Sequence, residues 1–196
     1  MSADSRTDAA VVRRCAWPKD ELNRLYHDTE WGVPQHDDRM LFEHLVLGGA
    51  QAGLSWAIVL RKRESYRKAF AGLEPQKVAR FNARKVESLL KNPGIIRNRQ
   101  KIASAVKNAR AFVAMQEEFG SFDTWLWRFV DGKPIVNRRR SLKDLPTRTP
   151  LSDRISEELK VRGFSFVGTT IIYAVLQAVG VINDHTLDCF RHAELS

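Results

Sequence analysis

Apolar residues recur at every third or fourth position along most of the chain, which is the spacing of one face of an α-helix. The clearest case follows Asn98, where Ile102, Val106 and Ala109 share a face. Similar patterns predict helices over residues 39–47, 55–70, 85–90, 122–130, 152–161 and 169–179, the fifth with Ser152 as its N-cap. No strand-like alternation is convincing and no internal repeat is found, so we predict an all-α protein.

One helical pattern meets two consecutive glycines, Gly48 and Gly49, within the stretch LVLGGAQAGLSW. A glycine inside a helix costs about 1 kcal/mol relative to alanine. We therefore expect the helix to end at this pair. The pair then forms either a tight helix–helix turn or a place where another group approaches the backbone.

Chain length and composition limit the class of protein. The 196 residues suit a single catalytic domain over residues 13–196, built from two helical lobes, after a mobile tail at residues 1–12. No apolar run is long enough to cross a membrane, and the N-terminus lacks the pattern of a secretion signal. We expect a monomeric cytoplasmic protein.

The charge of the chain indicates its partner. A net charge of +9 and a pI near 9.9 are high for an enzyme that acts on a small anion, and they suit a nucleic acid. Basic residues gather at 61–68, 97–101 and 137–140. Each cluster alone is typical of a solvated helix face, but together with the overall charge they favour DNA or RNA.

The two cysteines lie near opposite ends of the chain, and each has a histidine at a useful distance. Cys15 is followed by His27, and His185 precedes Cys189 by one helical turn. Two thiolates and two imidazoles are the ligand set of a closed, structural zinc site. The alternative is two buried free cysteines with two unrelated histidines. The other three histidines have no such grouping and are predicted to be surface or packing residues: His36, His44 and His192.

The segment Leu159–Gly180 is typical of a helix, a short hairpin and a second helix. Gly163 and Gly168 bracket the turn, and Thr169 and Thr170 open the second helix. Free backbone N–H groups at such a helix start can bind a phosphate. This is the pattern of a helix-hairpin-helix DNA-binding element, and the alternative is an ordinary helical hairpin.

Four aromatic residues lie in or near segments already singled out. Trp17, Tyr26 and Trp31 fall within residues 15–34, and Trp56 follows the double glycine. Near a DNA-binding element, aromatic rings suggest stacking on a base that has been turned out of the duplex. Each ring taken alone is more typical of a core residue, as we expect for Trp125 and Trp127.

Several motifs resemble those of the bacterial type I 3-methyladenine DNA glycosylases, a family in the helix-hairpin-helix glycosylase superfamily. They run from about residue 14 to 189 and read YHDTEWGVP, GAQAGLSW, KRESYRKAF, NPGIIRNRQKI, RGFSFVGTT and NDHTLDC. The resemblance implies a helix-hairpin-helix fold in which a structural zinc, held by Cys15, His27, His185 and Cys189, joins the two chain ends.

The same resemblance implies the DNA and base contacts. Trp17 and Trp56 would stack on the flipped base, and Tyr26 and Trp31 would line its pocket. Gln51 and Leu54 would insert their side chains into the duplex gap, and Gly53 between them would also contact DNA. The phosphate-binding hairpin would comprise Gly163, Phe166, Gly168, Thr169 and Thr170.

The chain departs from this family at Gly48, where a glutamate is usual and is thought to accept hydrogen bonds from the adenine. Its loss leaves a base donor unpaired, at a cost of about 1–3 kcal/mol, and leaves room in the pocket. A water is one possible replacement. Five carboxylates near the matched motifs are others: Asp28, Glu30, Asp37, Asp38 and Asp184. Asp184 has a second possible role, orienting the predicted ligand His185.

We therefore predict a monofunctional DNA glycosylase that releases N3-methyladenine, or a related alkylated purine, from double-stranded DNA and leaves an abasic site. No lysine follows the hairpin to support a lyase step. Two alternatives follow from Gly48: a glycosylase for a bulkier adduct, and a damaged-DNA-binding protein without catalysis.

Overall fold

The computed structural model describes residues 12–196, so most of the predicted N-terminal tail lies outside the described residues. Its elements are α1 (Glu21–Thr29), α2 (Asp38–Gln51), α3 (Trp56–Ala69), η1 (Ala71–Leu73), α4 (Pro75–Val78), α5 (Ala83–Leu90), α6 (Arg99–Phe119), α7 (Phe122–Trp127), η2 (Arg128–Val130), β1 (Ile135–Val136), η3 (Leu142–Asp144), α8 (Pro150–Val161), α9 (Thr169–Ala178), β2 (Ile182–Asn183) and α10 (Phe190–Glu194). No helix in this part of the chain is long and apolar enough to cross a membrane.

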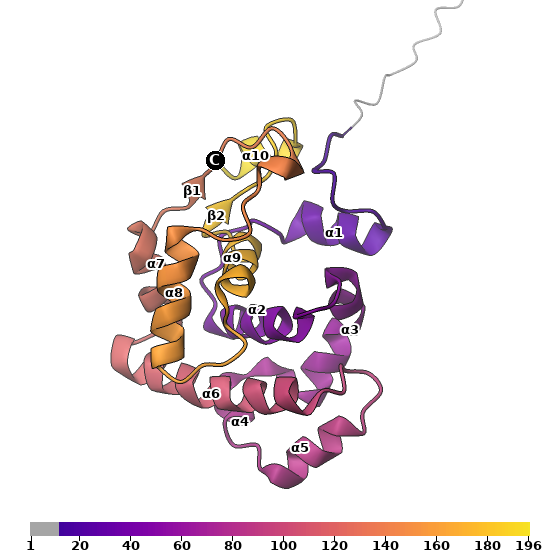
Figure 1. Cartoon of the computed structure of the whole chain (residues 1–196), viewed down its shortest axis with the longest axis vertical. Helices are drawn as coiled ribbons and strands as arrows, with labels where there is room; N and C mark the ends of the chain where they lie inside the picture. The colour runs from indigo at the N-terminus through magenta and orange to yellow at the C-terminus, as the bar shows by residue number, and fades with distance from the viewer. Residues whose placement is uncertain (1–11) are drawn as a thin grey trace, which may run out of the picture.

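The central helix α2 packs against α3, α6, α7 and α9, and the other elements surround this group (Figure 1). Every residue of α2 from Leu41 to Ala50 is buried. A large hydrophobic core forms around it, and a smaller apolar cluster joins α1 and α3 to the two chain ends. The helical prediction is thus confirmed for most of the chain.

The prediction that a helix ends at Gly48 and Gly49 is wrong, because α2 continues through both glycines to Gln51. Neighbouring elements approach the backbone where side chains would otherwise stand. A Cβ at Gly48 would lie 2.9 Å from Cγ2 of Val175, and one at Gly49 would lie 3.3 Å from Cβ of Phe166. Close packing here outweighs the low helix propensity of glycine. The reading of these glycines as points of backbone approach is the one that fits.

Two further local predictions need correction. The N-cap of α8 is Thr149, not Ser152, which sits three residues later and returns a hydrogen bond to the cap in a capping box. The structure also contains a short parallel pair, β1 with β2, that the all-α prediction missed. Each strand has only two residues, too few to show an alternating pattern.

The β1–β2 pair lies beside the place where the two ends of the described chain meet. In Figure 1 the first described residues, α1, β2 and α10 occupy the same end of the molecule. The backbone N–H of Phe190 donates to the carbonyl of Arg13, which ties the ends directly. Residues far apart in sequence are thereby brought together for the site.

Candidate functional site

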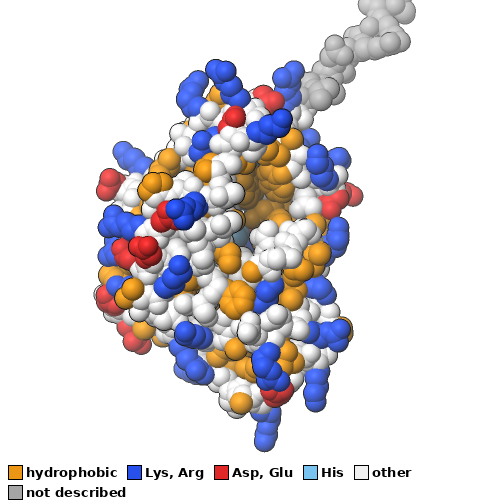
Figure 2. Space-filling model, viewed as in Figure 1, with side chains coloured by type: hydrophobic (Ala, Val, Ile, Leu, Met, Phe, Trp, Pro, Cys, Tyr) orange, Lys and Arg blue, Asp and Glu red, His pale blue; other side chains and the backbone are white. Residues whose placement is uncertain are grey.

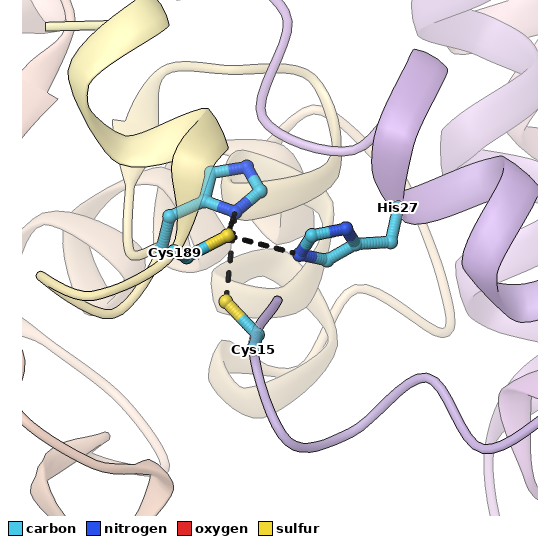
Figure 3. A group of neighbouring side chains, drawn as sticks. Cys15, His27 and Cys189 are labelled. Atoms are coloured by element: carbon cyan, nitrogen blue, oxygen red, sulfur yellow. Dashed lines mark hydrogen bonds between the residues drawn. The ribbon is translucent and has the colours of Figure 1, made fainter. Parts of the chain in front are cut away.

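Four buried side chains from the two chain ends form a Cys2His2 cluster. Cys15 precedes α1, His27 lies on α1, and His185 and Cys189 follow β2. Figure 3 shows Cys15, His27 and Cys189 pointing toward one another. Their ligand atoms and that of His185 all lie within 4.8 Å of one another.

The spacing of this cluster fits a tetrahedral metal ion. Cys189 Sγ lies 3.5 Å from His27 Nε2 and 3.5 Å from His185 Nδ1, and Cys15 Sγ lies 3.5 Å from His185 Nδ1. Metal–sulfur bonds near 2.3 Å and metal–nitrogen bonds near 2.0 Å give a tetrahedral S-to-N edge of about 3.5 Å. These three separations match that edge, so the cluster is able to hold a metal ion.

The second nitrogen of each histidine in the cluster is also held. His27 Nδ1 lies 2.8 Å from Asp28 Oδ1, and His185 Nε2 lies 3.1 Å from the carbonyl oxygen of Trp31. Such partners fix the ring orientation and leave the other nitrogen for a metal. The partner of His185 is thus the Trp31 carbonyl rather than Asp184.

Hydrogen bonds in the cluster favour a thiolate at Cys189. The bond with Cys15 lowers the pKa of the Cys189 thiol most, and bonds with His185 and His27 lower it further. The same sulfur–sulfur interaction, together with burial, raises the pKa of Cys15. The cluster therefore favours the thiolate form at Cys189, which is the form that binds metals.

An apolar cavity of about 310 Å³ lies next to the cluster. Figure 2 shows it as a hollow lined by hydrophobic side chains, with Lys and Arg on the same face around it. Its lining comes from the N-terminal segment, α1, α2, α3, the η3 region and α9: Trp17, Tyr26, Trp31, His44, Gly48, Gln51, Trp56, Leu142, Leu145, Ala174, Val175, Gln177 and Ala178. All five residues expected at the base pocket, including Gly48, are brought together here.

The aromatic wall of the cavity is continuous with the Cys2His2 cluster. Trp31 lies against both histidines, with ring centroids 6.0 Å from His27 and 4.5 Å from His185. Trp17 contacts His27 and Trp31, and Tyr26 contacts Trp56. The histidines of the cluster thus pack directly against Trp17 and Trp31, two of the rings that bound the cavity.

None of the five carboxylates considered as replacements for the missing glutamate lines the cavity. Each is bound elsewhere: Asp28 to Arg14 and His27, Glu30 to Arg63, Asp37 to the start of α2, Asp38 to Gln116 and the start of α7, and Asp184 to Asn137, Arg139, Tyr173 and Gln177. Among residues 12–196, no Asp or Glu side chain borders the cavity. A substitute carboxylate is therefore not found in this group.

His44 lines the cavity, which corrects its interpretation as a surface or packing residue. The other two histidines of that prediction lie elsewhere: His36 is exposed beside Trp127, and His192 binds the carbonyl of Asn137. Gln177 was also missed by the sequence reasoning. The only signal for His44 was its position, one helical turn before Gly48.

The space beside Gly48 is partly filled by α9. Because Val175 stands 2.9 Å from where a Cβ would be, and Ile171 stands 3.5 Å from it, the loss of a side chain at residue 48 does not leave a simple void. Extra room for a bulkier base does not follow from Gly48 alone.

The loop between α2 and α3 carries the residues expected to enter the duplex. Gln51 ends α2 at the cavity, Gly53 has a positive φ of 73°, and Leu54 exposes 38% of its surface. The ammonium group of Lys101 donates to the carbonyls of Ala50 and Ala52 and so closes the end of α2. The loop therefore presents an exposed apolar side chain three residues after Gln51, which lines the cavity.

The segment predicted to be a helix–hairpin–helix element comprises α8, a turn at residues 162–168 and α9. Gly163 and Phe166 have positive φ angles, and a Cβ at Gly168, the N-cap of α9, would meet no atom of another segment within 4 Å. The hydroxyl of Thr169 donates to Asp153, whereas Thr170 is exposed. Free backbone N–H groups at the start of α9 are thus accessible, as an anion site requires.

The turn of this hairpin is held by polar side chains that the sequence reasoning did not single out. Asn108 on α6 donates to the carbonyl of Ser165 and accepts from its N–H, both at 2.8 Å. Ser156 donates to the carbonyl of Val167. These bonds fix the hairpin conformation.

Comparison with known proteins gives consistent matches over nearly the whole chain. A family profile described as methyladenine glycosylase matches residues 16–192. The DNA-3-methyladenine glycosylase of Haemophilus influenzae is 45% identical over 91% of this chain and 97% of its own length. DNA-3-methyladenine glycosylase 1 of Escherichia coli K12 is 47% identical over 91% of this chain and 96% of its own length.

Solved structures agree with these matches. A crystal structure of 3-methyladenine DNA glycosylase I is 50% identical, covers 91% of this chain and 98% of its own, and superposes with a TM-score of 0.89. The Staphylococcus aureus enzyme, solved to explain its recognition of 3-methyladenine, is 35% identical with a TM-score of 0.86, over 88% of this chain and 92% of its own. The resemblance expected from the sequence motifs is confirmed, and the chain belongs to the methyladenine glycosylase family.

Proposed function

We propose that this protein releases N3-methylated adenine from double-stranded DNA by hydrolysis of the glycosidic bond, leaving an abasic site. The observation that carries the proposal is the aromatic cavity beside α2 and α9, in a chain whose relatives are 3-methyladenine glycosylases. The cavity volume falls within the range of small-molecule sites.

The cavity suits a cationic base. Methylation at N3 puts a positive charge on adenine and weakens its glycosidic bond, so the base leaves as a neutral molecule. Electron-rich rings of Trp17, Tyr26 and Trp56 can hold such a cation from several sides. The protein's contribution is then to extrude the nucleotide, hold the base between rings and admit a water to the sugar.

We assign the Cys2His2 cluster to a structural zinc ion. Cys15, His27, His185 and Cys189 supply four ligands of the types that closed zinc sites use, with S-to-N separations that match. Zinc would supply only structural bonding here, because the four protein ligands leave no position for water or substrate. Its position behind Trp31 would hold the cavity wall in place.

Contact with DNA is assigned to two segments on either side of the cavity. The accessible N–H groups at the start of α9 would bind a backbone phosphate, and Leu54 with Gln51 would fill the gap left by the flipped nucleotide. The excess positive charge supports this binding. One chain carries all these parts, which is consistent with a monomer.

Base release from methylated duplex DNA tests the activity. Chromatography should detect free 3-methyladenine after incubation with the protein, while 7-methylguanine, whose glycosidic bond is also weakened, serves as a comparison base. If no base appears at any protein concentration although the duplex is bound, the chain is a damaged-DNA-binding protein without catalysis.

A charge placed at the hairpin tests the DNA contact separately. Gly168→Asp meets no protein atom within 4 Å of its Cβ, so the fold should be unchanged. We expect weaker duplex binding and a shallower salt dependence. Ser88→Asp, at an exposed position on α5, makes the same charge change and is the control. Equal effects of the two variants would contradict a phosphate site at α9.

A further inference from the structure

The cavity lacks a carboxylate but contains one histidine in an unusual position. His44 lies on α2, four residues before Gly48, so both residues occupy one face of the helix. Side chains on a helix lean toward its N-terminus, and a long side chain at residue 48 would therefore lie over the turn that carries His44. The imidazole is buried and borders the same cavity.

One hydrogen bond decides which nitrogen of His44 can act as an acceptor. Its Nδ1 lies 2.9 Å from the carbonyl oxygen of Met40. A carbonyl oxygen only accepts, so Nδ1 carries the proton and the neutral ring keeps a lone pair on Nε2. No hydrogen bond joins Nε2 to any residue between 12 and 196.

The surroundings keep His44 neutral. Burial lowers the pKa of this imidazole below its ordinary value near 6.5, and the charge of Arg63 lowers it further. The bond to Met40 and the carboxylates of Glu43 and Glu30 act in the opposite direction. Both carboxylates are bound to Arg63, which limits their pull on His44. A cationic base in the cavity would disfavour a second positive charge and keep the ring neutral.

We propose that His44 Nε2 is the specificity-determining acceptor of this cavity, taking a hydrogen bond from the exocyclic amino group of the flipped adenine in place of the carboxylate absent at Gly48. The inference rests on the proposed glycosylase function. Adenine carries an amino donor at position 6, whereas guanine carries an oxygen acceptor there. A lone pair on His44 therefore pairs with 6-amino purines and opposes 6-oxo purines.

Gln177 is the competing acceptor, because its side-chain nitrogen donates to Asp184 and its amide oxygen remains. It lies on α9, two residues after Val175, which stands beside Gly48. The two assignments predict different variants to lose selectivity, so they can be separated.

The experiment compares release of 3-methyladenine and 3-methylguanine from methylated duplex DNA by the wild type, His44→Leu, His44→Gln and Gln177→Met. Leaving an amino group unpaired costs about 1–3 kcal/mol, which corresponds to a rate loss of about 5- to 150-fold. We expect that loss for 3-methyladenine with His44→Leu, little loss for 3-methylguanine, and partial recovery with His44→Gln, which restores an acceptor oxygen. His36→Leu, which removes an exposed histidine, should change neither rate.

Two further readouts separate recognition from a structural effect. Thermal melting should show that His44→Leu remains folded, and tryptophan fluorescence should show weaker binding of free 3-methyladenine. Release by the wild type should also fall at acid pH as His44 gains a proton and loses its acceptor, whereas His44→Gln should lack this step.

The outcomes are distinct for the two proposals. If the wild type releases no methylated base, the proposed function fails. If the wild type is active but His44→Leu keeps both its rate and its preference for the 6-amino base, the assignment of His44 is overturned. Loss of that preference in Gln177→Met alone would transfer the role to Gln177.

Discussion

The Cys2His2 cluster and the aromatic cavity are neighbours, yet their polar groups are arranged in opposite ways. In the cluster, both histidines have partners on their second nitrogen, and Cys15 Sγ also accepts from the backbone of Thr186. In the cavity wall, the indole N–H groups of Trp17 and Trp56 are buried without a partner among the described residues. The comparison distinguishes a site built to stay closed from one built to receive a ligand.

The difference has an energetic meaning. Buried polar groups usually have hydrogen-bond partners, and those that lack one mark a strained or functional place. Trp31 belongs to both regions, since its ring borders the cavity and its carbonyl accepts from His185. The cluster therefore holds the cavity wall in place while the indole N–H groups of Trp17 and Trp56 remain without hydrogen-bond partners among the described residues.

Loss of a metal ligand should have the largest effect, because it should disrupt both the cluster and the cavity that the cluster supports. Cys189→Ser removes a ligand from the cluster that ties both chain ends. A structural zinc in small zinc domains contributes on the order of 10 kcal/mol, so loss of even a third of that should lower Tm by about 10 °C in a chain of this size. Thermal melting with elemental analysis measures it.

The same variant should also lose base release, because Trp31 is no longer held. Ser88→Asp, outside the cluster, should keep both the metal and the melting temperature. An unchanged Tm in Cys189→Ser, or a wild type that contains no zinc, would contradict a structural metal.

Removal of one stacking ring should affect the cavity while leaving the cluster intact. Trp56→Ala deletes a half-buried ring that packs against Tyr26. Stacking contributes about 1–3 kcal/mol per base, so we expect release of 3-methyladenine to fall by about 5- to 150-fold. Zinc content should not change. If Trp56→Ala lost its metal as well, the two regions would not be separable.

The smallest effect should come from restoring the missing carboxylate, which sharpens the role of Gly48. Gly48→Glu forces its Cβ against Val175, and overpacking of this kind costs about 1–3 kcal/mol, partly offset by better helix propensity. Val175→Ala removes the obstructing methyl groups. We expect the variant that combines Gly48→Glu with Val175→Ala to be more stable than the sum of the two single free-energy changes predicts. It should also release base faster than Val175→Ala alone.

Strict additivity in denaturant unfolding would contradict this coupling, since residues in contact usually show an interaction energy. Gly49→Ala is a matched control for a neighbouring glycine, because its contact is with Phe166 rather than with Val175. It should not respond to Val175→Ala.

Much of this arrangement could be predicted from the sequence. The period of apolar residues predicted the helices, and residue type and spacing indicated the grouping of the two cysteines with two histidines that the structure shows. The family resemblance of the motifs predicted that the four aromatic residues would form one pocket. These features are local, or depend on side-chain chemistry that few other residues share.

The rest depends on contacts between distant segments. The path of α2 through Gly48 is set by Val175 on α9, and no local rule contains that information. The position of His44 at the cavity, and the capture of all five candidate carboxylates by other partners, appear only when the chain is folded. The low helix propensity of glycine predicted the wrong end for α2, because tertiary packing outweighs that propensity here.

The helix α9 has its N-cap at Gly168, where the hairpin ends, and first lines the cavity at Ala174 and Val175. Seven residues of helix span about 10 Å. Under the proposed function, the length of α9 sets the distance between the phosphate bound at its N-terminus and the base held in the cavity. Asn108 fixes the position of the hairpin through its two hydrogen bonds with the backbone of Ser165. This amide, although remote from the cavity, would therefore help to select which nucleotide along the strand enters the cavity.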